Sequence, residues 1–195
     1  MRIGFGFAAR SVLSLVVLCA VLTSCGDGVE EKKSSGLITD TEKHRMMQAE
    51  IDSLEQIVYA DDFEFDKEQV VALRSTYDEF ASRFSGDETK SPEYLYKSAA
   101  LSRAVRKPTE AIKTYQHILT KFKGFDRNPE VQFLIAFTYD EDIRERSLAK
   151  ESYREVIEKF PGDHWAIQAE RRLETIDMTD EEMIRYFMDK QGEVQ

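Results

Sequence analysis

Hydrophobic residues recur at steps of three and four over most of the chain, which is the spacing of one face of an α-helix. In the segment 41–60 this apolar stripe consists of Met47, Ile51, Leu54, Ile57 and Val58. The same spacing predicts helices over 67–84, 92–106, 108–122, 128–142, 147–160, 163–176 and 179–190. An amphipathic helix needs a neighbour to cover its apolar stripe. We therefore predict an all-α chain of packed helices.

Polar residues mark where several of these helices begin. Asp66 with Gln69, and Thr179 with Glu182, have the spacing of a capping box, and Ser91 precedes a proline as a typical N-cap. The carboxylates of 61–66 do not form a calcium-binding EF-hand loop, because the required glycine and final glutamate are missing. The acidic loop before 67 is therefore predicted to cap a helix.

Two aromatic positions recur at intervals of 38 residues between Leu73 and Leu173. They are Tyr77, Tyr115 and Tyr153, and Phe84, Phe122 and Phe160. Repeats of about this length are typical of stacked helical hairpins, in which each hairpin buries its apolar side against the next. The interval predicts a tandem helical array over 61–176.

Within this array the helix pairs resemble the tetratricopeptide repeat, which places small residues and one aromatic at fixed spacing. The matching residues are Ala99, Ala111 and Tyr115 in one pair, and Ala136, Ala149, Tyr153 and Pro161 in the next. The first small residue of the second pair lies thirteen rather than twelve residues before its partner, which predicts one extra residue around 142–146. The tryptophan of the motif is missing from both pairs, and Lys123 replaces the proline of the first.

The resemblance implies a short α-solenoid of antiparallel helical hairpins. Helices 41–60 and 177–195 would then be capping elements at its two ends, since the terminal units of such arrays are atypical. In tetratricopeptide arrays the first helices of successive hairpins line a concave face that holds an extended peptide or a helix. The residues implied for this groove are Tyr96, Arg103, Phe133, Phe137 and Asp140. In the alternative interpretation, helix 41–60 covers this face and the aromatic residues belong to the core.

Residues 1–24 have the pattern of an export signal. Arg2 and Arg10 precede an apolar run over 11–23 that is short for a membrane span. The run ends in Leu-Thr-Ser-Cys, which resembles the bacterial lipobox, so cleavage is expected between Ser24 and Cys25. Cys25 would then carry the acyl chains, palmitate among them. The alternative is an ordinary secretory signal that contains a cysteine by chance.

The residues after Cys25 bear on the location of the protein. The segment 25–40 is rich in Gly, Ser and charge and is predicted to be a flexible tether. By resemblance to enterobacterial lipoproteins, Gly26 in place of an aspartate implies sorting to the outer membrane, facing the periplasm. Asp27, Glu30 and Glu31 loosely resemble export tags, which leaves display on the cell surface as an alternative.

The charge balance argues against nucleic acid as a partner. The chain has a formal net charge of −10, and without residues 1–24 it holds 25 basic and 37 acidic residues. Such a surface repels phosphate backbones. We therefore expect a protein partner, with the membrane contacted through the acyl anchor.

Candidate chemistry is sparse. The only cysteines are Cys19 and Cys25, and the three histidines are scattered singly, so neither a disulfide framework nor a metal site is predicted. The sequence shows neither a nucleophile with a nearby base nor a glycine-rich phosphate loop. We therefore expect a protein without enzyme activity, cofactor or small-molecule substrate.

The layout of a lipobox followed by helical repeats resembles the tetratricopeptide envelope lipoproteins of Gram-negative bacteria. Two branches are similar: the Tol–Pal system coordinator and the lipoprotein of the β-barrel assembly machinery. The resemblance implies a scaffold for protein–protein interaction in envelope assembly, division or maintenance. The alternatives are a subunit of an outer-membrane protein assembly machine and a surface-exposed binding lipoprotein.

Overall fold

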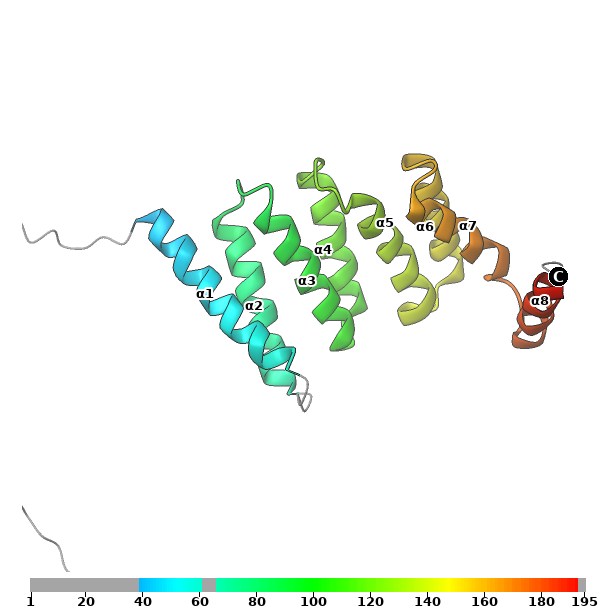
Figure 1. The fold of residues 1–195 in the computed structure, drawn as a ribbon, viewed down its shortest axis with the longest axis horizontal. Coiled ribbons are helices and arrows are strands. Elements are labelled where there is room, and N and C mark those ends of the chain that lie inside the picture. The colour runs from blue at the N-terminus through cyan, green and yellow to red at the C-terminus, as the bar shows by residue number, and fades with distance from the viewer. Residues whose placement is uncertain (1–38, 61–65, 193–195) are drawn as a thin grey trace, which may run out of the picture. The chain divides into compact units, whose positions relative to one another are not determined.

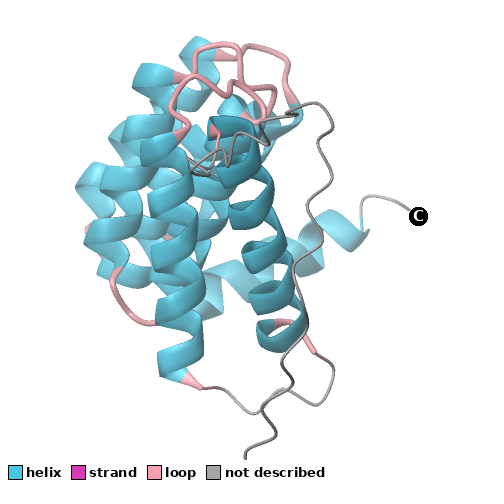
Figure 2. Ribbon diagram, turned by 90° about the vertical axis from the view of Figure 1, so that its left-hand side faces the viewer, coloured by secondary structure: helices cyan, strands magenta, loops and turns pink. Residues whose placement is uncertain are grey.

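The computed structural model describes residues 39–60 and 66–192, and in this part of the chain every regular element is a helix (Figures 1 and 2). The helices are α1 (Asp40–Val58), α2 (Lys67–Arg83), α3 (Lys90–Ala104), α4 (Pro108–Lys121), α5 (Asn128–Phe137), η1 (Thr138–Ile143), α6 (Arg146–Lys159), α7 (His164–Thr175) and α8 (Asp180–Gly192). The predicted all-α fold is confirmed for these residues. The predicted signal peptide, the predicted cleavage and acylation site at Cys25 and nearly all of the predicted tether lie outside these residues.

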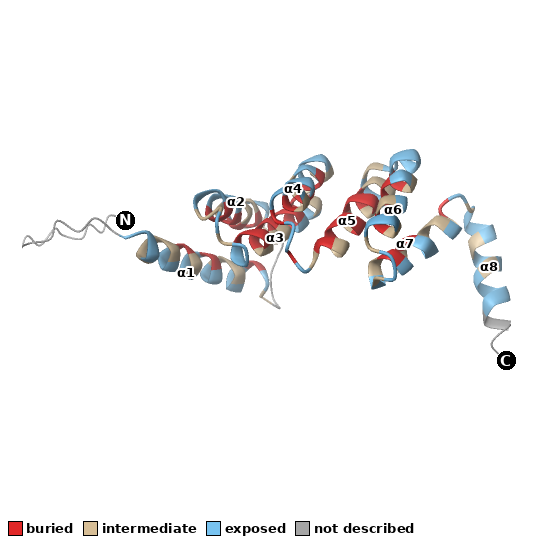
Figure 3. Ribbon diagram, turned by 90° about the horizontal axis from the view of Figure 1, so that it is seen from above, coloured by how far each residue is buried: buried red, intermediate tan, exposed pale blue. Residues whose placement is uncertain are grey.

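Consecutive helices pack against each other from α1 to α7, and α5 also packs against α7. Figures 1 and 3 show α1, α3, α5 and α7 in one layer and α2, α4 and α6 in the other. Each helix from α2 to α6 therefore packs against two helices of the other layer, which is how amphipathic helices of this length cover their apolar faces.

The core consists of three clusters, one around each of the repeated tyrosines. Tyr77, Tyr115 and Tyr153 are fully buried and belong to α2, α4 and α6, the helices of one layer. Each lies in a different cluster, so the 38-residue interval places the same kind of side chain in each successive cluster. The small residues Ala99, Ala111, Ala136 and Ala149 are also fully buried. The repeated tyrosines and the motif alanines are thus core positions, whereas Phe84 and Phe160 are only partly buried and Pro161 is exposed.

Helix α1 supplies the first cluster with Met47, Ile51 and Val58, which are buried against α2 and α3. Ile57, which the stripe also included, is 45% exposed. It follows the stripe by sequence spacing, but it lies on the outer edge of the helix, where no helix of the described part covers it. The buried stripe of α1 is therefore narrower than predicted.

The helix caps agree with the sequence in two places and differ in one. The Asp66 carboxylate accepts hydrogen bonds from the backbone of residues 68 and 69, and Thr179 and Glu182 bond to each other's backbone reciprocally. Ser91 is not the N-cap of α3, because the helix begins at residue 90 and the Ser91 hydroxyl donates to Phe84 O at 2.7 Å. Asp87 instead accepts from the backbone N–H groups of residues 89 and 90.

The extra residue expected around 142–146 is accommodated by a π-helix. After Phe137 the α-helix widens into the π-helical segment η1, and Arg144 then ends it in the left-handed conformation, with φ of 64°. A π-helical turn takes one residue more than an α-helical turn, so it absorbs an insertion without displacing the packed face. The insertion therefore begins inside the helix, a few residues before the predicted turn.

The predicted capping role of the C-terminal helix is not confirmed. In α8 the apolar side chains of Ile184, Phe187 and Met188 are 52–67% exposed, and Figure 3 shows this helix mainly in the colour of exposed residues. Its apolar side thus does not cover the end of the helical stack.

Candidate protein-binding face

The five residues implied for a peptide groove all come from one layer of helices. Tyr96 and Arg103 lie on α3, Phe133 and Phe137 on α5, and Asp140 on η1. Because α3 and α5 are neighbours in this layer, most of these side chains take part in two sets of contacts, one around Tyr96 and one around Phe137. We refer to Tyr96, Arg103, Phe137, Asp140 and the charged residues bonded to them as the α3–α5 face.

At one end of the α3–α5 face, Tyr96 is held by charged groups from α5 and from the turn before it. Its hydroxyl donates to Glu130 Oε1 at 2.8 Å, and the Arg127 guanidinium lies 3.6 Å from the ring centroid. Arg127 also bonds to Glu130 at 2.9 Å and to Glu93 at 3.2 Å. Burial and the hydrogen bond to Glu130 raise the pKa of Tyr96 well above its usual value. The phenol therefore stays protonated and acts as a hydrogen-bond donor.

At the other end, Phe137 lies close to two arginine side chains. The guanidinium groups of Arg103 and Arg172 are each 4.9 Å from its ring centroid, within the range of a cation–π interaction. Arg103 Nε bonds to Asp142 Oδ2 at 2.5 Å, and Arg172 bonds to Glu141 Oε1 at 2.7 Å. These ion pairs join η1 to α3 on one side and to α7 on the other.

Asp140 is the most enclosed acid of η1. It accepts a hydrogen bond from the Tyr153 hydroxyl at 3.2 Å and lies 3.7 Å from Arg172. Burial raises the pKa of Asp140, and the nearby Arg172 charge offsets part of that effect. Asp140, one of the residues implied for the groove, thus also links η1 to α6 and α7.

Phe133 belongs to the core and does not line a surface. It is only 7% exposed, and its ring packs 5.0 Å from Trp165 and 5.5 Å from Tyr153, measured between centroids. Sequence reasoning left open that the aromatic residues are core, and for Phe133 the structure matches that interpretation. The alternative in which α1 covers the groove residues does not match the structure. Helix α1 packs on α2, and it contacts α3 through the 2.8 Å bond from Lys97 to Glu55.

Sequence reasoning missed the charged partners of this face, which are Glu93, Arg127, Glu130, Glu141, Asp142 and Arg172. The bonds of this face that join α3 to α5, α3 to η1 and η1 to α7 connect residues 31–39 positions apart. This is close to one repeat length, so a search for opposite charges one repeat apart would have found them.

The α3–α5 face combines the partly buried aromatic side chains of Tyr96 and Phe137 with paired cations and anions. Carboxylates and guanidinium groups keep hydrogen-bonding capacity beyond one partner. An incoming peptide backbone or side chain can therefore bond to these groups while the ion pairs remain. This arrangement suits recognition of a polypeptide.

The described residues contain no group of three or more His, Cys, Asp and Glu side chains placed to hold a metal ion. Among the helices described, none combines the length and the apolar character needed to cross a membrane. No protein-family model matches the chain, and no curated protein matches it either.

Proposed function

We propose that this chain is a lipid-anchored, non-catalytic scaffold that binds another protein in the Gram-negative cell envelope, as part of envelope assembly, division or maintenance. The observation that carries this proposal is the placement of Tyr77, Tyr115 and Tyr153 in three successive core clusters of a layered helical array. Arrays of stacked helix pairs offer long continuous faces, and such faces serve protein recognition.

A tetratricopeptide-like α-solenoid is the architecture that we propose for the array. Three observations support it: consecutive helices alternate between two layers, the motif alanines are buried, and α1 occupies the place of the first helix of the first pair. The motif alanines allow the two helices of a pair to approach closely. We assign the partner-binding role to the α3–α5 face, with an extended peptide or a helix as its ligand.

The anchor is proposed from the sequence alone. Cleavage before Cys25 and acylation of its thiol would hold the protein at the outer membrane, since several acyl chains bind far more firmly than one. With Gly26 following the cysteine, we propose that the helical array faces the periplasm.

The anchor is tested by comparing Cys25→Ala with Cys19→Ala. Both changes remove a thiol from the same segment, but only Cys25 is proposed to carry lipid. We expect Cys25→Ala to abolish labelling by radioactive palmitate and to release the protein from washed membranes, while Cys19→Ala leaves both unchanged. Full membrane retention of the Cys25→Ala protein would remove the anchor from the proposal.

The binding face is tested by photo-crosslinking in intact cells. A photoreactive phenylalanine analogue at Tyr96 or Phe137 is expected to yield one discrete product, identified by mass spectrometry. The same analogue at Lys113, an exposed residue of α4 in the opposite layer, is the control. Equal products from all three positions would show that the α3–α5 face is not the binding surface.

The identity of the product separates the candidate roles. A β-barrel assembly protein would indicate a subunit of that machine, and a division or peptidoglycan-associated protein would indicate a coordinator. Protease added to whole cells is a separate measurement: loss of the protein would place it on the cell surface.

A further inference from the structure

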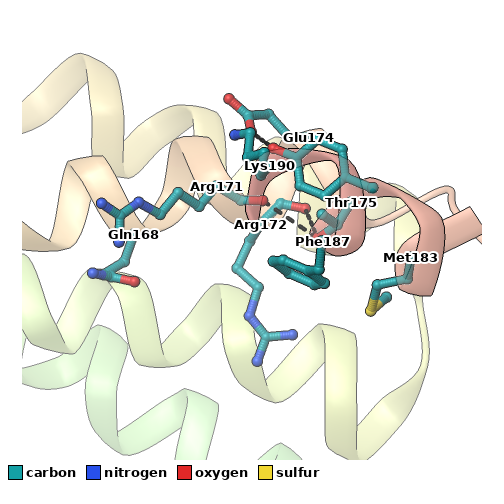
Figure 4. Close-up of a pocket in the computed structure, with 9 residues that line it drawn as sticks. Gln168, Arg171, Arg172, Glu174, Thr175, Met183, Phe187 and Lys190 are labelled. Carbon is teal, nitrogen blue, oxygen red and sulfur yellow. Dashed lines mark hydrogen bonds and ion pairs between the residues drawn. The ribbon is translucent and has the colours of Figure 1, made fainter. Parts of the chain in front are cut away.

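A groove of about 520 Å³ lies between α7 and α8 and shares only Arg172 with the α3–α5 face (Figure 4). The α7 side of this α7–α8 groove carries Arg171 and Arg172, and the α8 side carries Met183, Phe187 and Lys190. Figure 4 shows Arg171 and Arg172 extending from α7 in different directions, with the Phe187 ring on the α8 side. The groove therefore combines cationic groups with an apolar wall.

The charge of the α7–α8 groove is opposite to that of the chain. Its lining contains three cations, Arg171, Arg172 and Lys190, and one anion, Glu174, whereas the whole chain has a net charge of −10. Two of these cations already have an acidic neighbour: Arg172 is bonded to Glu141, and Lys190 lies 3.5 Å from Glu174. Arg171 is exposed to solvent. A local positive site on an acidic protein favours an acidic ligand.

The apolar wall belongs to a helix that the stack does not cover. Phe187 is 52% exposed although it faces the groove, and Met183 beside it is only partly buried. Met183, Tyr186, Phe187 and Lys190 follow one face of α8 at steps of three and four. Exposed apolar surface with a polar rim is typical of a site that a partner covers.

The position of α8 depends on weak polar contacts with α7. The Tyr186 hydroxyl donates to Glu174 Oε2, and Lys190 Nζ approaches the same carboxylate. Exposed ion pairs contribute little to stability. A ligand that packs against Phe187 can therefore shift α8 at low cost.

We propose, on the basis of the interaction function proposed above, that the α7–α8 groove binds an acidic amphipathic helix of a partner protein. Its apolar side chains pack on Met183 and Phe187, and its carboxylates pair with Arg171 and Lys190. A helix fits because an apolar stripe flanked by charge matches a groove between two helices. A second copy of this chain is disfavoured, because the net charge of −10 makes two identical molecules repel each other over their whole surface.

The test uses full-length protein in mild detergent and two synthetic helical peptides. Both peptides carry leucine at alternating steps of three and four, and the remaining positions are glutamate in one and lysine in the other. Fluorescence anisotropy is expected to show the glutamate peptide binding about tenfold more tightly, with affinity that falls as salt is added. Absence of binding, or equal binding of both peptides, overturns the assignment.

Three variants locate the binding. Arg171→Glu combined with Lys190→Glu is expected to lower the affinity for the glutamate peptide about tenfold, and Phe187→Ala to lower it several-fold. Ile184→Ala is the matched control, because Ile184 is an exposed apolar residue of α8 that does not line the groove. Circular dichroism checks that each variant keeps its helix content. If Ile184→Ala weakens binding as much as Phe187→Ala, the groove is not the site.

Two further measurements examine other occupants. Self-association with rising protein concentration, lost in Phe187→Ala, would assign the groove to a second copy instead. Binding to vesicles of anionic phospholipid, lost in the double charge reversal, would assign it to a membrane surface. Neither the Cys25→Ala fractionation nor crosslinking at Tyr96 involves α8, so failure of the groove leaves the proposed scaffold function standing.

Discussion

The guanidinium group of Arg127 lies over the ring of Tyr96, with its central carbon 3.6 Å from the ring centroid. The same guanidinium is bonded to Glu93 on α3 and to Glu130 on α5. The Arg127 side chain, from the turn between α4 and α5, therefore connects α3 and α5, two neighbouring helices of the same layer. On the α3–α5 face, the groups proposed to meet a partner also hold the stack together.

Arg127→Ala is therefore expected to destabilise the fold as well as alter the face. It removes a cation–π interaction of about 0.5–2 kcal/mol and two partly exposed ion pairs of at most about 1 kcal/mol each. We expect the free energy of unfolding, measured in urea, to fall by about 1–2 kcal/mol. Lys113→Ala, an exposed substitution on α4, is the control and should change it by less than about 0.5 kcal/mol. Equal effects of the two substitutions would contradict the fastening role of Arg127.

Ala99 and Ala100 offer a matched pair for testing the close approach of helices. Ala99 is fully buried in the cluster around Tyr115, whereas its neighbour Ala100 is exposed. Leucine at position 99 must push α3 and α4 apart, at about 1–3 kcal/mol. Ala100→Leu should stay within about 0.5 kcal/mol of the parent chain. Thermal unfolding of both variants measures the difference, and similar melting temperatures would show that the helices do not meet closely at Ala99.

The core was predictable from sequence because it depends on spacing alone. The tyrosine interval and the paired alanines gave the buried positions, and the apolar stripes gave all eight α-helices to within a few residues. The sequence spacing also indicated the extra residue before Ala149, but it did not indicate that a π-helix accommodates this residue. An inserted residue in a helix and one in a turn look alike in a sequence, and the structure places this one in the π-helical segment η1.

The surface was less predictable because it depends on pairs of side chains. Tyr96 and Arg103 were identified one at a time, but their bonds to Glu130 and Asp142 join separate repeats. The exposure of α8 had no sequence signal either: its apolar spacing is the same as that of a buried helix. A stripe of apolar residues indicates that a helix needs a partner, and it does not say whether the partner belongs to the same chain.

Asp87 gives a prediction for acid conditions. Burial tends to raise its pKa, but hydrogen bonds from the backbone of Lys90, from His44 and from the backbone of Thr89 outweigh burial, so the pKa is lowered. A carboxylate whose pKa is lower in the folded chain stabilises the fold above its ordinary pKa. This contribution is lost as the pH falls through the lowered pKa.

Asp87→Ala should therefore cost about 1 kcal/mol near neutral pH, the usual effect of removing such a cap. The difference from the parent chain should shrink as the pH falls below about 3.9, where the free carboxyl becomes protonated. Urea unfolding of both proteins, from neutral pH to below about pH 3.9, measures this difference in the free energy of unfolding. Glu88→Ala changes the exposed neighbouring acid and is the control. A difference that stays constant down to the lowest pH would mean that the Asp87 charge does not contribute.

The buried tyrosines give the opposite prediction, for alkaline conditions. Burial raises the pKa of Tyr115 to about 12. Burial also raises the pKa of Tyr77, with a further contribution from Glu55, and the pKa of Tyr153, with a further contribution from Asp140. A phenol whose pKa is higher in the folded chain stabilises the fold fully below its unfolded pKa of about 10. That stability is lost as the pH rises from there through the folded pKa.

Tyr115→Phe removes one of these groups and should flatten the pH dependence. Between about pH 10 and pH 12 the parent chain should lose about 2–3 kcal/mol more stability than the variant, because two pKa units correspond to that free energy. Below about pH 9 the two stability curves should run parallel, which serves as the internal control. Urea unfolding at each pH, with phenolate absorbance recorded in parallel, measures both. Curves that remain parallel above pH 10 would show that the Tyr115 phenol ionises as easily in the fold as in the unfolded chain. The core cluster around Tyr115 would then be accessible to water.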